Sequence, residues 1–242
     1  MPRYLDRPQA DAADADPNLA LPYGLSAAGI VASINDLYAY LHALNAASIE
    51  HGYDRLEDIM LPAGFSGLLS ELFVRAVAKQ HGHSQPGIAR NQRPGGRPDL
   101  VPRAVYPGDS VHRGEEGVEV KASGNATSWQ GHNPETGWLM VVQVKIDRLT
   151  SPVYDRAPTE VLRVLIANLV EADWTYSGRS AESRRTPTAS INRAGRDKLS
   201  AGTIFEKGRS RGEAPPADVG PPRELEGSAI DARKAVGSWI RQ

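Results

Sequence analysis

Apolar and polar residues follow a helical period in the first third of the chain and a strand period after it. From Ser26 the apolar positions recur at spacings of four, three, four and three residues, as on one face of an amphipathic helix. This pattern predicts a helix over 26–48. A second helix is predicted over 66–81, with Ser66 as its N-cap and Gly82 at its end. The face of the first helix consists of Ile30, Ile34, Leu37, Leu41 and Leu44.

Beyond the second helix the period becomes that of strands. Residues 82–97 are rich in Gly, Pro and polar side chains and are predicted to form a loop. The segment 160–178 is interpreted as a strand with a hairpin partner or bulge, although its VLIANLV run also fits a helix. The other elements that we expect are strands over 99–106, 117–123 and 137–147, a short helix over 190–202, an arm over 207–222 and a terminal helix over 228–241.

The order of these elements indicates an α/β fold with a mixed central sheet flanked by helices, plus an N-terminal helical region. A chain of 242 residues fits one large domain or two small ones. We divide it into an N-terminal arm and helical region packed on the core (1–65), the core (66–206), and a linker or arm with a C-terminal helix (207–242).

Composition excludes several classes of protein. The absence of cysteine excludes disulfides, thiolate metal sites and a cysteine nucleophile. No apolar run approaches the roughly 20 residues of a membrane span, and the N-terminal residues lack the apolar segment of a secretory signal. We therefore expect a cytoplasmic protein with no membrane partner. The motifs of P-loop ATPases and α/β-hydrolases are also missing.

Charge is distributed unevenly, although the formal net charge is only −1. Residues 1–80 carry −5, whereas the segment 179–211 holds nine basic residues and three acidic ones. Such asymmetry favours an acidic half and a half that faces a polyanion, although a solvated surface would also accommodate it. Overall neutrality is thus compatible with a nucleic-acid partner.

Two carboxylates and a lysine form the candidate chemistry. Glu119 and Lys121 alternate with apolar residues in a predicted strand, so their side chains share one face. Asp99 begins an earlier strand, and Asp109 is an alternative to it. Two carboxylates suit Mg²⁺, and a lysine beside them can orient a water molecule or stabilise charge on a phosphate. The Gln143-Val144-Lys145 run is a second choice that lacks the acid, and His81 and His83 are expected to be simply polar.

The Pro98-Asp99 and Glu119-Val120-Lys121 arrangement resembles the PD-(D/E)XK nuclease superfamily, and type II restriction endonucleases in particular. Nineteen residues separate Asp99 from Glu119, and an apolar strand follows the second motif. Many of these enzymes also carry an acid on the helix before the first motif, where this chain has Glu71. The resemblance implies a restriction-endonuclease-like core of the order α-β-β-β-α-β.

The resemblance also implies roles for these residues. Asp99, Glu119 and the main-chain carbonyl of Val120 would bind Mg²⁺, Lys121 would position the attacking water, and Glu71 would assist. The expected activity is sequence-specific hydrolysis of double-stranded DNA to 5′-phosphate ends by a homodimer. A cognate DNA methyltransferase is expected in the same system but not as a bound subunit. The alternatives are a repair or junction-resolving nuclease of the same fold and a non-catalytic DNA-binding protein.

Contacts to DNA are expected from two further groups of residues. Amide and imidazole side chains in the loop after the second motif suit base edges. Arginines and hydroxyl groups near the predicted third helix, and in the Gly/Pro-rich loop, suit phosphates. The candidates are Arg93, Arg97, Gln130, His132, Asn133, Arg184, Arg185, Thr186, Arg193 and Lys198.

Overall fold

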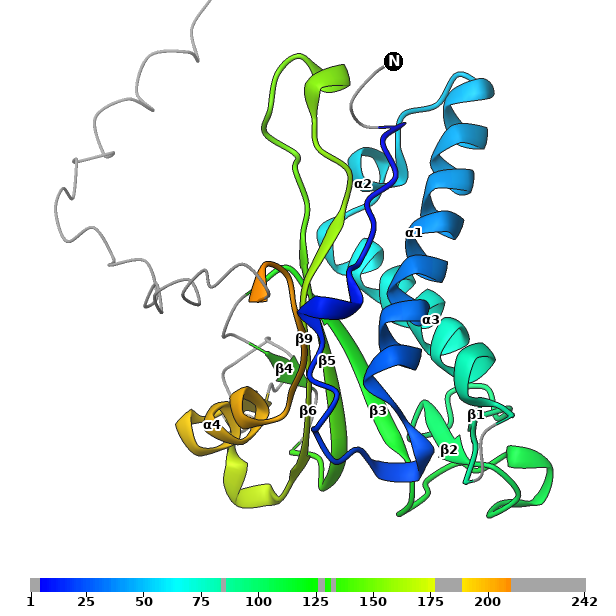
Figure 1. The fold of residues 1–242 in the computed structure, drawn as a ribbon, viewed down its shortest axis with the longest axis vertical. Coiled ribbons are helices and arrows are strands. Elements are labelled where there is room, and N and C mark those ends of the chain that lie inside the picture. The colour runs from blue at the N-terminus through cyan, green and yellow to red at the C-terminus, as the bar shows by residue number, and fades with distance from the viewer. Residues whose placement is uncertain (1–4, 84–85, 126–128, 132–133, 177–188, 210–242) are drawn as a thin grey trace, which may run out of the picture.

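A computed structural model of the chain describes residues 5–83, 86–125, 129–131, 134–176 and 189–209 (Figure 1). It has an α/β fold built on a six-stranded mixed sheet, which confirms the general fold class expected from the order of elements. Its α-helices are α1 (Ala27–Glu50), α2 (Leu56–Ile59), α3 (Pro62–His81) and α4 (Arg193–Ala201).

The large sheet has the strand order β1-β2-β3-β5-β6-β9. Strands β3 and β5 are parallel, and every other neighbouring pair in this sheet is antiparallel. A small antiparallel sheet has the order β4-β8-β7. The strands of the large sheet are β1 (Ile88–Arg90), β2 (Leu100–Pro102), β3 (Val118–Ser123), β5 (Gly137–Lys145), β6 (Glu160–Leu169) and β9 (Thr203–Glu206). Those of the small sheet are β4 (Gln130–Gly131), β7 (Trp174–Tyr176) and β8 (Ala189–Ile191).

Two hydrophobic clusters lie on opposite faces of the large sheet. Helices α1 and α3 cover one face of the sheet (Figure 1). On that face Val118 and Val120 of β3 are buried among apolar side chains of both helices. On the other face, Leu139 and Val141 of β5 pack with residues of the small sheet and with Leu199 of α4. Because side chains alternate along a strand, β3 directs Glu119 and Lys121 away from α1 and α3.

The two long helices were predicted well, apart from one boundary. Ser26 caps α1, because its Oγ accepts a hydrogen bond from Gly29 N at 3.1 Å. Helix α3 begins at Pro62 rather than at Ser66, so Ser66 is not an N-cap. Proline at a first helical position has a φ angle suited to a helix and has no N–H to leave unpaired, which explains the earlier start. The predicted boundary between residues 65 and 66 therefore falls inside α3.

Three other predicted elements differ from the structure. The loop 82–97 contains β1, whose Ile88 and Ala89 are buried and pair with β2. The strand expected over 99–106 ends at Pro102, because the chain turns at Ala104 with a φ of 62°. The helix expected from residue 190 starts at Arg193, because residues 189–191 pair as strand β8 and Asn192 provides the cap.

The C-terminal half of the sheet matches the predicted strands in part. Strand β3 and β5 fall within 117–123 and 137–147, and 160–178 divides into β6, a turn of 3₁₀-helix and β7. Strand β9 was not predicted. The arm over 207–222 and the helix over 228–241 lie outside the described residues, apart from 207–209. No helix in the described ranges has the length and apolar character that a bilayer crossing requires.

His81 belongs to the core. Its side chain is 2% exposed, and its Nε2 atom accepts a hydrogen bond from Ser26 N at 3.2 Å. The ring packs on Gly29 of α1, where a Cβ atom would come within 2.2 Å of it. The imidazole therefore joins α3 to the start of α1 in a structural role.

Candidate active site

The site is built on an edge of β3 that its neighbouring strand leaves open. Strand β2 pairs with β3 at a single position, Leu100 with Val118. Beyond that point side chains take the place of a strand: Val120 N donates to Asp99 Oδ2 at 2.8 Å, and Ala122 N donates to Ser70 Oγ at 2.7 Å. These bonds satisfy buried edge N–H groups and fix both Asp99 and helix α3 against the strand.

The loop that carries Asp99 is organised by Asn91, whose side chain is 5% exposed. Its Nδ2 atom donates to the carbonyl groups of Pro98 and Val111, both at 2.9 Å. Its Oδ1 atom accepts from the N–H groups of Arg93 and Val111. The amide thus uses all four of its hydrogen-bonding positions. Asn91 N also donates to Asp99 O, so the position of Asp99 depends directly on this residue.

The second motif lies beside Asp99, since Val120 N donates a hydrogen bond to it and the charges of Glu119 and Lys121 act on its pKa. Lys121 Nζ is 3.0 Å from Glu119 Oε1 on one face of β3. In a strand the N–H and C=O of one residue point to the same side, so the Val120 carbonyl faces the edge that Asp99 occupies. Asp99, Glu119 and the Val120 carbonyl therefore form one group of oxygen atoms.

Burial, and next the charge of Glu119, raise the pKa of Asp99 to about 7. The hydrogen bond from Val120 N–H and the charge of Lys121 oppose this rise without cancelling it. Two carboxylates that repel each other in a partly buried site favour a cation between them. Carboxylate and carbonyl oxygens are the donors that Mg²⁺ prefers. Among the described residues no group of three or more His, Asp or Glu side chains forms a larger ligand set, so water would complete the coordination.

Lys121 carries a firmly held positive charge. Burial acts to lower the pKa of its ammonium group, but the charges of Glu119 and Glu135 outweigh that effect and raise the pKa above its ordinary value. Lys121 therefore stays protonated at neutral pH. In this state it can donate hydrogen bonds and attract an anion, but it cannot accept a proton from water.

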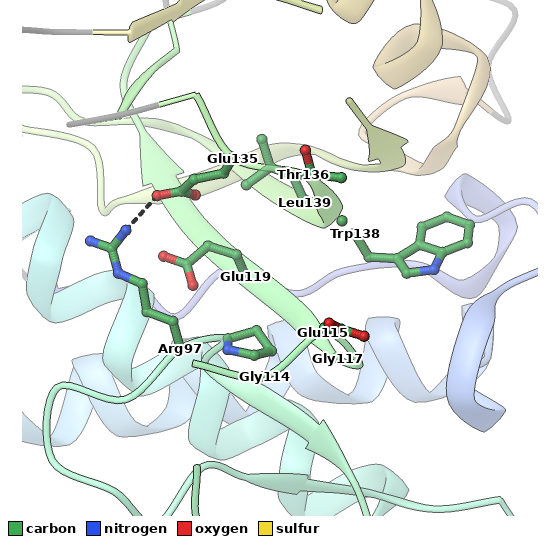
Figure 2. A pocket seen from close by; sticks show the side chains of 11 residues that line it. Arg97, Gly114, Glu115, Gly117, Glu119, Glu135, Thr136, Trp138 and Leu139 are labelled. Atoms are coloured by element: carbon green, nitrogen blue, oxygen red, sulfur yellow. Dashed lines mark hydrogen bonds and ion pairs between the residues drawn. The ribbon is translucent and has the colours of Figure 1, made fainter. Parts of the chain in front are cut away.

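Glu135 is a member of the site that the sequence analysis did not identify. Its carboxylate is 2.6 Å from Arg97 Nη1 and 3.6 Å from Lys121 Nζ. Arg97, Glu119 and Glu135 line a cavity of about 90 Å³ beside the start of β5 (Figure 2). Glu135 lies two residues before β5, and only the parallel pairing of β5 with β3 brings it to the Glu119-Val120-Lys121 motif. No short motif in the sequence marks it.

The structure places the other candidate residues, Asp109, Gln143 and Glu71, in different surroundings from Asp99. Asp109 Oδ1 accepts a hydrogen bond from Ala104 N at 2.8 Å in a surface turn, whereas Asp99 is the acid beside Glu119. Gln143 is buried in β5 and accepts a hydrogen bond from Arg163. Glu71 on α3 is 59% exposed and pairs with Arg90 at 3.3 Å, near enough to Asp99 to contribute to its raised pKa.

One of the predicted DNA-binding arginines, Arg97, lines this cavity, and another, Arg93, lies four residues before it in the chain. Arg93 and Arg97 are exposed on the loop between β1 and β2. Backbone hydrogen bonds, from Arg97 N to His112 O and from Gly114 N to Arg97 O, place Arg113 beside Arg97. Arg113 is exposed too, but the sequence analysis did not single it out, because nearby acids balance its charge along the chain.

The other predicted contacts lie elsewhere. Arg193 begins α4 and its side chain is 89% exposed, whereas Lys198 forms an ion pair of 2.6 Å with the buried Asp173. Lys207 and Arg209 pair with Glu160 and Asp16, so part of the charge of the basic segment is neutralised within the protein. His132, Asn133, Arg184, Arg185 and Thr186, and the side chain of Gln130, lie outside the described residues.

Comparisons of the chain with protein-family models, with curated proteins and with solved structures found no match. The functional proposal therefore depends on the residues, fold and site of this chain.

Proposed function

We propose that the protein is a Mg²⁺-dependent, sequence-specific endonuclease that acts on double-stranded DNA, with a site of the PD-(D/E)XK type. The observation that carries this proposal is the contact between the two motifs, in which Asp99 accepts the Val120 N–H beside Glu119 and Lys121. A helix before the motif strands and an apolar strand after them support it.

Each residue has a role that its position supports. Asp99, Glu119 and the Val120 carbonyl would hold Mg²⁺, which supplies positive charge to the scissile phosphate and activates a water molecule. Lys121, held protonated, orients that water and stabilises the negative charge that develops on the phosphate. Glu71 assists from the exposed rim. Hydrolysis leaves 5′-phosphate and 3′-hydroxyl ends.

The proposed partner is double-stranded DNA. Arg97 lines the cavity, Arg113 lies beside Arg97, and Arg93 is exposed on the same loop as Arg97. Guanidinium groups in exposed positions such as these suit DNA phosphates. A homodimer on a palindromic site and a cognate methyltransferase in the same system complete the proposal of a type II restriction enzyme.

Cleavage of plasmid DNA tests the proposal directly. We expect the wild type to give discrete fragments with 5′-phosphate ends in the presence of Mg²⁺ and none in EDTA. Asp99→Asn should lower the rate on the order of 10²- to 10³-fold, because a metal-binding charge is lost from the site. Asp109→Asn is the matched control and should retain activity, since its acid lies outside the oxygen group.

Other outcomes would lead to the alternatives. Preferential cleavage of branched or mismatched substrates would support a repair or junction-resolving nuclease. DNA binding without cleavage of any unmodified or methylated substrate would support a non-catalytic protein. Equal activity of the wild type and Asp99→Asn would contradict the assigned site.

A further inference from the structure

Glu135 forms ion pairs with two cationic side chains, Arg97 in the cavity wall and Lys121 of β3. Its Oε1 atom is 2.6 Å from Arg97 Nη1, and its Oε2 atom is 3.6 Å from Lys121 Nζ. Figure 2 shows its carboxylate directed toward Arg97 and near that of Glu119. The side chain is 21% exposed, so solvent screens these charges only in part.

The backbone of Glu135 is held independently of its carboxylate. Trp174 Nε1 donates a hydrogen bond of 2.8 Å to the Glu135 carbonyl oxygen. Trp174 is 7% exposed and belongs to the hydrophobic cluster on this face of the sheet. Replacing the Glu135 carboxylate by an amide therefore leaves its main-chain anchor in place.

In the proposed reaction Glu119 cannot both bind the cation and hold Lys121. In the structure Lys121 contacts Glu119 at 3.0 Å and Glu135 at 3.6 Å. A cation held by Glu119 would withdraw that carboxylate from Lys121 and would repel the ammonium group. Glu135 is the other carboxylate within 4 Å of Lys121 among the described residues, and it is not part of the oxygen group around Asp99.

We propose that Glu135 is a positioning residue that holds Lys121 at the site while Glu119 binds the cation. This inference rests on the proposed function and extends it to a residue outside both motifs. Glu135 contacts neither the cation nor the DNA in this role. It acts through Lys121, whose position beside the reacting phosphate it maintains.

A matched pair of variants isolates this role. Glu135→Gln removes the negative charge with little change in shape. Glu115→Gln makes the same change at another residue that lines the cavity, and Glu115 forms no hydrogen bond or ion pair within the described part of the chain. Thermal unfolding of both variants establishes that each one is folded before any comparison is made.

Kinetics on plasmid DNA give the first readout. We expect Glu135→Gln to lower kcat about 10- to 100-fold, as is usual for residues that orient a catalytic group. Kd for Mg²⁺, measured by calorimetry, should stay within about twofold of wild type, which a general loss of structure would not allow. KM for DNA should not rise, because Arg97 loses the carboxylate that pairs with it and stays available to DNA. Glu115→Gln should match the wild type. An unchanged kcat for Glu135→Gln, or a weaker Mg²⁺ affinity, would overturn the proposal.

Crystal structures with Ca²⁺ give a second readout that needs no cleavage. We expect Lys121 Nζ to bond to Glu135 in the wild type and to leave that position in Glu135→Gln. If Lys121 keeps the same position in both proteins, Glu135 does not hold it. Should the wild type neither cleave DNA nor bind a dication through Asp99, the proposed function fails. The role of Glu135 then fails with it, because without a cation Glu119 already holds Lys121 at 3.0 Å.

Discussion

At the scale of single residues, the chemistry of the site follows from how closely its charges are held together. Asp99 is largely buried at the edge of β3, close to Glu119. Its burial and the negative charge of Glu119 raise the pKa of Asp99 to about 7. Lys121 lies beside the same carboxylates, and its pKa is raised as well. At neutral pH the site therefore contains a protonated lysine and an aspartic acid that is about half protonated. A dication would displace the remaining proton.

The raised pKa of Asp99 predicts how stability depends on pH in the absence of a cation. The folded protein keeps this proton up to about pH 7, whereas an unfolded Asp loses it near pH 3.8. The folded state thus binds more protons in this window, and the contribution of Asp99 to the free energy of unfolding falls as pH rises through it. Chemical denaturation in EDTA should show Asp99→Asn gaining stability relative to wild type between about pH 4 and pH 7. A constant difference across this range would contradict the assignment.

The raised pKa of Asp99 also predicts that the affinity for Mg²⁺ depends on pH. Below pH 7, Mg²⁺ must displace the proton of Asp99, so Kd for Mg²⁺ should fall about tenfold per pH unit as pH approaches 7 and then level off. Calorimetry in buffers of different ionisation enthalpy measures the number of protons released. We expect close to one at pH 6 and almost none at pH 8.5. Release that does not change with pH would show that Asp99 is not the titrating ligand.

At the scale of elements, the site depends on a strand edge and on the loop that closes it. Strand β2 leaves β3 after one pair, and the side chains of Asp99 and Ser70 complete the hydrogen bonds of that edge. On the other side of β3, its parallel neighbour β5 begins just after Glu135. The loop that carries Asp99 and the residues just before β5 thus lie on either side of β3. This arrangement brings Asp99, Glu119 and Glu135 to one site although they are far apart in the chain.

Because Asn91 organises the loop that carries Asp99, we expect both the stability and the metal affinity of the protein to depend on its side chain. Asn91→Ala removes four hydrogen bonds and leaves buried partners unsatisfied, at a cost of about 1–3 kcal/mol in the free energy of unfolding. Because Asp99 depends on this loop, the variant should also bind Mg²⁺ more weakly. Gln92→Ala is the control, since its exposed side chain makes one hydrogen bond, to Arg90 O. Denaturation and calorimetry on both variants measure the two effects, and equal losses would argue against the role of Asn91.

At the scale of the whole molecule, the basic residues that the structure describes are arranged differently from the charge distribution along the sequence. The segment 179–211 is the most basic, yet Lys198, Lys207 and Arg209 pair with acids from distant elements. The exposed arginines beside the cavity come instead from a region whose charges nearly cancel along the chain. The surface that we propose for DNA is therefore the loop pair around Arg97 and Arg113.

Salt dependence of DNA binding distinguishes the two groups of basic residues. If Arg93 contacts a phosphate, Arg93→Gln should reduce the slope of log K against log salt by about 0.9. Lys198→Gln should leave the slope unchanged, since its ammonium is occupied by Asp173. Fluorescence anisotropy over a series of salt concentrations measures both slopes. The opposite pattern would move the DNA surface to α4.

The sequence by itself determined the two long helices, the main strands and the pair of motifs, because each depends on local periodicity or on neighbouring residues. It placed Glu119 and Lys121 on one face of β3 and put Asp99 ahead of Asp109. Helix and strand boundaries at Pro62, Ala104 and Asn192 were missed, since they are set by a proline, a turn and a pairing strand.

Tertiary structure alone decided the remainder. It brought Glu135 to Lys121 through the parallel pairing of β3 with β5, and it placed Asp99 against the Val120 N–H while Asp109 accepts from Ala104 N in a turn. It also neutralised Lys198 with Asp173. The physical reason is common to these cases: periodicity along the chain encodes which face of an element is buried, whereas charges interact through space, with partners that the pairing of distant strands brings near.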